Sequence, residues 1–247
     1  MKRLAHHSQY FLRNPRLVKE LVGHSVLKRT DTVLDIGAGS GVIASVLAEA
    51  CEQVIAVEYE PRTAQKLRDN MKVYSNVTVY EGDFLTMPLP EGRYSVFANI
   101  PFHLSSPILR RLTEAEYSPE AIYLIVQRQF AKKLQIDQGQ FTGLLGAYIA
   151  PLYSVRIRKA LKRTDFWPHP NVDTVLVELL RRPKPLLSND KMLQYRRFVA
   201  RCYESSVFFA KAPLRAVGIP DDTRPSQMTI MQWLMLFQYT VDDKDRR

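Results

Sequence analysis

The sequence predicts an α/β protein with a mostly parallel sheet, and three observations carry this prediction. Short β-branched runs alternate with helical patterns through the first two thirds of the 247 residues. A glycine-rich turn at residues 37–41 follows the first buried run. The composition, 46% hydrophobic and 24% charged, is that of an ordinary globular protein. Together they predict a Rossmann-like domain whose sheet is covered by helices on both faces.

The predicted elements follow one another in the order typical of such a domain. Asn14-Pro15 predicts a helix start, because Asn caps a helix and Pro fits its first turn. Strands are then predicted at residues 32–36, 53–57, 77–80, 95–98 and 121–126, with helices at 41–50, 61–71 and near 107–116. Residues 148–157 and 174–180 are predicted as two more strands, which would add an antiparallel edge and bring the sheet to seven strands.

The last quarter of the chain predicts a second, smaller domain. Residues 181–185, Arg-Arg-Pro-Lys-Pro, resist regular structure and resemble a linker. Residues 190–240 show only helical patterns, with Met231, Leu234, Met235 and Phe237 on one apolar face. We therefore expect residues 1–182 to form the α/β domain and residues 183–247 a small all-α domain.

The positive charge is concentrated in one segment. Of the net +10, residues 154–215 contribute +9, from 14 Lys and Arg against 5 Asp and Glu. Such a field attracts polyanions, and its concentration favours a nucleic-acid partner over a solvated surface or a membrane. No apolar run reaches the roughly 18 residues of a membrane span, and the N-terminus lacks a secretory pattern.

The cysteines and histidines predict neither disulfides nor a metal site. The two cysteines form neither a disulfide framework nor a metal-ligand spacing, so we expect a reducing, cytoplasmic location. The five histidines have no metal spacing either, and no metal is expected. Because no unpaired apolar face is left over, we expect a monomer.

The glycine turn predicts a nucleoside cofactor. Gly37, Gly39 and Gly41 let the backbone turn sharply and let a ligand approach closely. Glu58, at the end of the next strand, is placed to accept both ribose hydroxyls. The spacing G-x-G-x-G differs from the G-x-G-x-x-G of dinucleotide sites, and it fits a ligand without phosphates, such as S-adenosylmethionine. Asp83 follows the third strand and is either a contact for the adenine amine or a turn residue.

The segment Asn99-Ile100-Pro101-Phe102 predicts methylation of an exocyclic amine. It follows the fourth strand, at the edge where open α/β sheets bind substrates. The Asn99 side-chain oxygen and a carbonyl of Ile100 or Pro101 would accept both N–H groups and turn the nitrogen lone pair toward the methyl donor. Phe102 would stack on the base. In isolation the segment is also compatible with a capped turn.

A proline-rich loop in the basic segment carries two aromatic residues, Phe166 and Trp167. A base that has left its helix for methylation would be held between Phe166 and Phe102. The structural alternative is a hydrophobic plug over the core.

At these positions the sequence resembles the ribosomal RNA adenine N6-methyltransferases. The resemblance covers residues 8 to about 180 and rests on Ser8-Gln9-Tyr10-Phe11-Leu12, the Asp35–Gly41 turn, Glu58, Asp83, Asn99–Phe102 and the Phe166-x-Pro-x-Pro-x-Val segment. It implies a Rossmann-like S-adenosylmethionine domain and a helical C-terminal domain that grips RNA. It also implies cofactor contacts at Gln9, Tyr10, Leu12, Gly37, Gly39, Glu58, Asp83 and Asn99, and base contacts at Asn99, Ile100, Pro101, Phe102 and Phe166. Tyr10 stands where the family usually has Asn.

Two branches of this family differ in substrate. Ser8 before Gln9, the Asn99–Phe102 segment and the short C-terminal part resemble the macrolide–lincosamide–streptogramin resistance (Erm) branch, which methylates one adenine of 23S rRNA. The alternative is the 16S rRNA dimethyltransferase branch of ribosome biogenesis. A non-catalytic RNA-binding assembly factor and a DNA adenine methyltransferase are the remaining hypotheses, because fold does not fix function.

Overall fold

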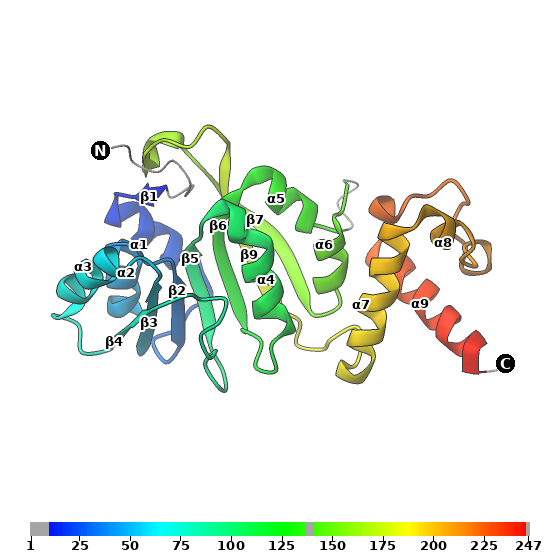
Figure 1. The fold of residues 1–247 in the computed structure, drawn as a ribbon, viewed down its shortest axis with the longest axis horizontal. Coiled ribbons are helices and arrows are strands. Elements are labelled where there is room, and N and C mark those ends of the chain that lie inside the picture. Colours follow the sequence, from blue (N-terminus) through cyan, green and yellow to red (C-terminus); the bar gives the residue numbers. More distant parts are fainter. Residues whose placement is uncertain (1–9, 137–140, 246–247) are drawn as a thin grey trace. The chain divides into compact units, whose positions relative to one another are not determined.

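The computed structural model describes residues 10–136 and 141–245, and its centre is a seven-stranded sheet. The strand order is β4-β3-β2-β5-β6-β9-β7 (Figure 1). The strands are β2 (Thr32–Ile36), β3 (Gln53–Glu58), β4 (Val77–Glu81), β5 (Ser95–Asn99), β6 (Ala121–Gln127), β7 (Tyr153–Leu161) and β9 (Thr174–Arg181). The β4, β3, β2, β5 and β6 strands are parallel, and β9 pairs antiparallel with β6. The predicted parallel sheet with an antiparallel edge is confirmed.

The helices begin where local sequence signals place them. Asn14 caps the first helix, since its Oδ1 accepts the amide N–H of Arg16 at 3.0 Å. Glu60 caps α3 through the amides of Arg62 and Thr63. The helices are α1 (Pro15–Gly23), α2 (Val42–Ala50), α3 (Pro61–Met71), α4 (Ser105–Glu114), α5 (Arg128–Leu134), α6 (Leu144–Ile149), α7 (Asn189–Glu204), α8 (Ser206–Ala210) and α9 (Ile230–Asp245). In the described part of the chain, no helix is long and apolar enough to cross a membrane.

Two short strands attach the beginning of the described chain to a distant loop. The β1 strand (Phe11–Leu12) pairs antiparallel with β8 (Phe166–Trp167), with Phe11 opposite Trp167 and Leu12 opposite Phe166. Leu12 and Phe166 are only 4% and 1% exposed and belong to the hydrophobic core. Burial of these two side chains therefore fixes the register of the pair.

The chain divides into two compact units, which differ from the single boundary expected at residue 182. One unit comprises residues 1–130 and 156–180, and the other residues 131–155 and 181–247. The chain enters the second unit for the last time at residue 181, close to the boundary expected at residue 182. Residues 131–155, however, belong with the C-terminal helices, as the hydrogen bond from the Tyr195 hydroxyl to the Ala147 carbonyl illustrates.

The prediction of a strand beginning at Tyr148 is wrong. Residues 144–149 form helix α6, and the strand begins only at Tyr153. A short apolar run has no periodicity that separates a strand from a buried helix, so its partners decide. Here Gly146 packs against the end of α5, close enough that only a residue without Cβ fits.

Gly146→Ala tests this packing. A Cβ at residue 146 would lie 2.5 Å from the Lys133 carbonyl oxygen, a backbone atom that cannot rotate away. We expect a loss of about 2 kcal/mol in the free energy of unfolding, measured by urea denaturation. Gly23→Ala is the control, because nothing lies within 4 Å of its Cβ position. Equal stability of the two variants would contradict the packing.

Candidate active site

The glycine turn is bonded to the strand beside it. Gly37, Gly39 and Gly41 have φ angles of +71°, +59° and +93°, a region that side chains disfavour. The amides of Gly37 and Ala38 both donate to the Val57 carbonyl, at 2.8 and 2.9 Å. The turn is thereby held open at the carboxyl edge of the sheet, between β2 and β3.

Glu58, the last residue of β3, lies between the turn and the start of α3. Its side chain is only 4% exposed. One carboxylate oxygen accepts the amide N–H of Gly39 at 2.9 Å, and the other accepts that of Glu60 at 3.0 Å. The carboxylate thus remains a fixed acceptor with lone pairs to spare.

The Asn99 segment lies directly beside the turn. Asn99 ends β5, and its Nδ2 donates to the Tyr10 carbonyl at 2.5 Å. A Cβ added to Gly37 would lie 3.6 Å from Pro101 Cδ, so the two segments are in near contact. The Pro101 carbonyl accepts the amide of Leu104, which starts a short 3₁₀ turn at Phe102.

These elements line one cleft with two adjoining cavities, which share Gly37, Glu58 and Pro101. The first cavity is also lined by Tyr10, Phe11, Asn99, Ile100 and Phe102. The second is also lined by Ile36, Val57, Tyr59, Gly82, Asp83, Phe84, Leu85, His103, Leu104 and Ile108. None of these described lining residues is Lys or Arg, and two are acidic, so the cleft suits a ligand rich in hydroxyl and amino donors rather than in phosphates.

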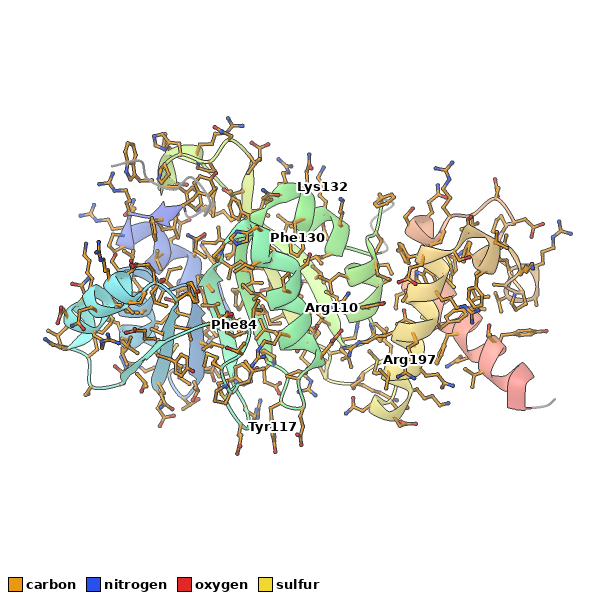
Figure 2. The ribbon with its side chains drawn as sticks, viewed as in Figure 1. Phe84, Arg110, Tyr117, Phe130, Lys132 and Arg197 are labelled. Atoms are coloured by element: carbon orange, nitrogen blue, oxygen red, sulfur yellow. The ribbon has the colours of Figure 1, made fainter. Side chains whose placement is uncertain are left out.

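The loop after β4 forms one wall of the second cavity. Asp83 accepts the amide of Leu85 at 2.8 Å through one oxygen, which makes it a turn residue as well as a lining residue. Phe84, labelled in Figure 2, is buried beneath the guanidinium of Arg111, at 5.6 Å from the ring centroid. Arg111 also donates to the carbonyls of Leu85 and Met87, which holds this loop in place.

Asp35 is a buried acid behind the turn. It is fully buried, and neither of its carboxylate oxygens has a hydrogen-bond partner among the described residues. Burial raises the pKa of Asp35 to about 8, the Glu58 carboxylate adds to the rise, and the nearby amide of Ala44 offsets part of it. The Asp35 side chain is therefore largely protonated at neutral pH.

Most of the predicted site residues meet in this cleft. Eight of them line it: Tyr10, Gly37, Glu58, Asp83, Asn99, Ile100, Pro101 and Phe102. Gly39 lines neither cavity but contributes the amide bonded to Glu58. Gln9 and Ser8 lie outside the described residues.

Two predicted residues lie elsewhere. Phe166 lines neither cavity and is 1% exposed, because its pairing with Leu12 turns it into the core. The expected stack of a base between Phe166 and Phe102 stays a prediction. The ring beside Phe102 is that of Tyr10, with centroids 5.3 Å apart. Leu12 is likewise a core residue rather than a lining residue.

Several lining residues were not assigned a role from the sequence. Phe11 lines the first cavity beside Tyr10, and Tyr59 and Phe84 line the second. The sequence contained a signal for them, because each directly follows a residue that was identified: Tyr10, Glu58 and Asp83. His103, for which lining the pocket and a surface role were both open, lines the second cavity. Residues just past a strand end share its edge of the sheet.

Known proteins resemble this chain along most of its length. Residues 2–206 match the family model described as Ribosomal RNA adenine dimethylase. Ribosomal RNA small subunit methyltransferase A of Latilactobacillus sakei is 30% identical over 73% of this chain. The rRNA adenine N-6-methyltransferase of Saccharopolyspora erythraea is 28% identical over 96%. The matched regions span 64% and 65% of the lengths of these two curated relatives.

A solved structure resembles the fold closely. The crystal structure of the 23S rRNA methyltransferase ErmE has a TM-score of 0.80 and 27% identity. The match covers 92% of this chain and 98% of the ErmE chain.

Asp35→Asn tests the protonation of the buried acid. A folded-state pKa near 8, above 3.8 in the unfolded chain, means that the folded state binds the extra proton. The free energy of unfolding should therefore fall as pH rises from about 5 to about 8, by at most about 1.4 kcal/mol per pH unit. Asp35→Asn should remove this component of the decline, as measured by urea unfolding across that range. Asp222→Asn, at an exposed aspartate, is the control and should keep the wild-type profile. Identical profiles for Asp35→Asn and the wild type would contradict a neutral Asp35.

Proposed function

Because the chain belongs to the ribosomal RNA adenine dimethylase family, we propose that it transfers a methyl group from S-adenosylmethionine to N6 of an adenine in ribosomal RNA. The observation that carries the proposal is the position of Asn99. Its amide lines a cavity that adjoins the glycine turn and Glu58, so a nucleoside and an exocyclic amine fit side by side in one cleft.

The cleft fits S-adenosylmethionine by the chemistry of its donors and acceptors. The Glu58 carboxylate suits ribose hydroxyls, and the Asp83 carboxylate suits the adenine amine. Ile36, Leu104 and Ile108 provide apolar contact for the purine. The lining residues Gly37, Glu58, Asp83 and Asn99 would hold the cofactor, with Gly39 shaping the turn from behind. When bound, S-adenosylmethionine supplies a methyl group activated by its sulfonium charge.

Asn99, at the end of β5, and the residues that follow it would orient the substrate amine. The lone pair of an exocyclic amine is delocalised into the ring, so two acceptors must hold both N–H groups and turn it out of the plane. Asn99 Oδ1 is one acceptor. The Ile100 carbonyl is the better second acceptor, because the Pro101 carbonyl already accepts the Leu104 amide. Phe102 offers its ring to the base.

We favour 23S rRNA as the substrate. The similarity to ErmE covers 98% of that chain, and the Ser8-Gln9 and Asn99–Phe102 segments favour the same branch. Methylation there would confer macrolide–lincosamide–streptogramin resistance. The similarity to small subunit methyltransferase A keeps 16S rRNA as the second candidate.

The unit formed by residues 131–155 and 181–247 carries a groove lined by arginine and phenylalanine side chains. Phe198 lies 6.2 Å from Phe208 and 5.9 Å from Phe237, measured between ring centroids. The Arg201 guanidinium lies 4.3 Å above the Phe208 ring, and Arg197 of α7 lines the same groove (Figure 2). Guanidinium groups bind phosphates, which supports RNA binding here. Phe237 is 1% exposed and forms the floor of the groove.

Asn99→Ala tests the catalytic assignment. Removing the amide should lower methyl transfer by roughly 100-fold or more, while S-adenosylmethionine binding remains measurable by calorimetry. Transfer is measured with labelled cofactor on 23S rRNA, 16S rRNA and duplex DNA, followed by nucleoside analysis. Asn189→Ala, at an exposed asparagine of α7, is the matched control.

Each outcome of this assay has a meaning. Wild-type label in 23S rRNA alone supports the proposal, and label in 16S rRNA moves the protein to the biogenesis branch. Preferential label in duplex DNA, or cofactor binding without any transfer, overturns it. Normal turnover by Asn99→Ala contradicts the role of that amide.

The double change Arg197→Ala and Arg201→Ala tests the groove. If both guanidinium groups contact phosphates, the salt dependence of RNA binding should weaken by about one to two units of slope. Binding is followed by fluorescence anisotropy of an rRNA fragment across a salt series. Arg215→Ala is the control, since that guanidinium is paired with Asp221. An unchanged slope in the double variant would exclude the groove as a phosphate site.

A further inference from the structure

The hydrogen bond between Asn99 and Tyr10 determines which way the catalytic amide faces. The Tyr10 carbonyl only accepts hydrogen bonds, so the atom facing it at 2.5 Å must be the amide nitrogen of Asn99. The planar amide then directs its oxygen away from Tyr10. If the amide were rotated by 180°, the Asn99 NH₂ group would face the substrate amine. Both groups are donors, so the amine would lose Asn99 Oδ1 as an acceptor.

The Tyr10 ring holds this carbonyl in place. It packs on Phe102 with ring centroids 5.3 Å apart and planes tilted by 34°. Phe102 belongs to the same segment as Asn99, so the ring contact and the hydrogen bond clamp Tyr10 onto that segment at two points. Such a pair of aromatic rings contributes about 0.5–1.5 kcal/mol beyond its buried area.

Phe11, the next residue, lines the same cavity but packs on a different segment. The Phe11 ring lies against the glycine turn, where a Cβ on Gly39 would be 3.1 Å from Phe11 Cδ1. The Tyr10 ring packs instead on Phe102, in the segment that contains Asn99, although the family resemblance implied a cofactor contact at this position.

We propose that Tyr10 is a positioning residue whose carbonyl sets the orientation of the Asn99 amide and whose ring anchors that carbonyl on Phe102. The proposal rests on the proposed function, because it assigns Asn99 Oδ1 as the acceptor for the adenine amine.

A double-mutant cycle tests the proposal. Tyr10→Ala should slow methyl transfer at saturating cofactor and rRNA by about 10- to 100-fold, since the amide loses its fixed orientation. Its affinity for S-adenosylmethionine should stay close to that of the wild type. Tyr10→Phe keeps the ring and should recover most of the lost rate. In the Asn99→Ala background, Tyr10→Ala should cost little more, because no amide remains to be oriented.

The opposite results would overturn the proposal. Additive losses in the cycle, or weaker cofactor binding at an unchanged saturating rate, would make Tyr10 a structural or cofactor residue. Tyr117→Ala removes an exposed tyrosine ring far along the chain (Figure 2) and controls for loss of an aromatic side chain.

A second measurement separates this proposal from the proposed function. The side-chain NH₂ signal of Asn99, identified by its absence in Asn99→Ala, can be followed by ¹⁵N NMR without any substrate. It should shift in Tyr10→Ala and stay near its wild-type position in Tyr10→Phe. If the wild type transfers no methyl group, the proposed function fails, yet this signal still tests the contact. An Asn99 signal that does not move in Tyr10→Ala would contradict the proposal directly.

Discussion

The cleft depends on Glu58, because this one residue joins three segments of the carboxyl edge. Its carboxylate accepts the Gly39 amide and so ties the glycine turn to β3. Its backbone carbonyl accepts the Gly82 amide at 2.9 Å, which brings the loop carrying Asp83 alongside. Its second carboxylate oxygen accepts the Glu60 amide at the start of α3. A buried carboxylate with such partners is costly to lose, because the amides would be left unpaired.

The same residue also faces the cleft, since Glu58 lines both cavities. Glu58 therefore both shapes the glycine turn and lines the cleft, and a substitution cannot change one role without the other. A substitution that removed the carboxylate would change the turn as well as the acceptor that we propose for the ribose. Asn99 differs in this respect. Its amide donates a hydrogen bond to the Tyr10 carbonyl, which lies outside the sheet, so its chemistry is more nearly independent of the scaffold.

The sequence predicted the features that depend on neighbouring residues. The apolar run 32–36 and the glycines after it define a strand and a turn by local rules alone. Because parallel strands end at a common edge, Glu58, Asp83 and Asn99 were expected to meet, and they line one cleft. The cap at Asn14 and the proline at the start of α3 are equally local.

The features that escaped prediction depend on partners far along the chain. Tyr148 lies in a helix because Gly146 packs on α5, and its own neighbours do not reveal this. The register of β1 on β8 decides that Phe166 is buried and that Tyr10 takes the place beside Phe102. A shift of one residue in that pairing would exchange the two faces of the loop, and no local pattern fixes it.

This pairing changes how the proline-rich loop acts on the site. Phe166 is buried beside Leu12, so it anchors β1, and β1 begins directly after Tyr10. We infer that the loop can influence the Asn99 amide through the chain that it holds, as well as through a Phe166 ring laid on the base. Loss of activity on removing Phe166 would follow from either arrangement. The distinction lies in the Asn99–Tyr10 hydrogen bond, which a displaced β1 would break and a missing base contact would leave intact.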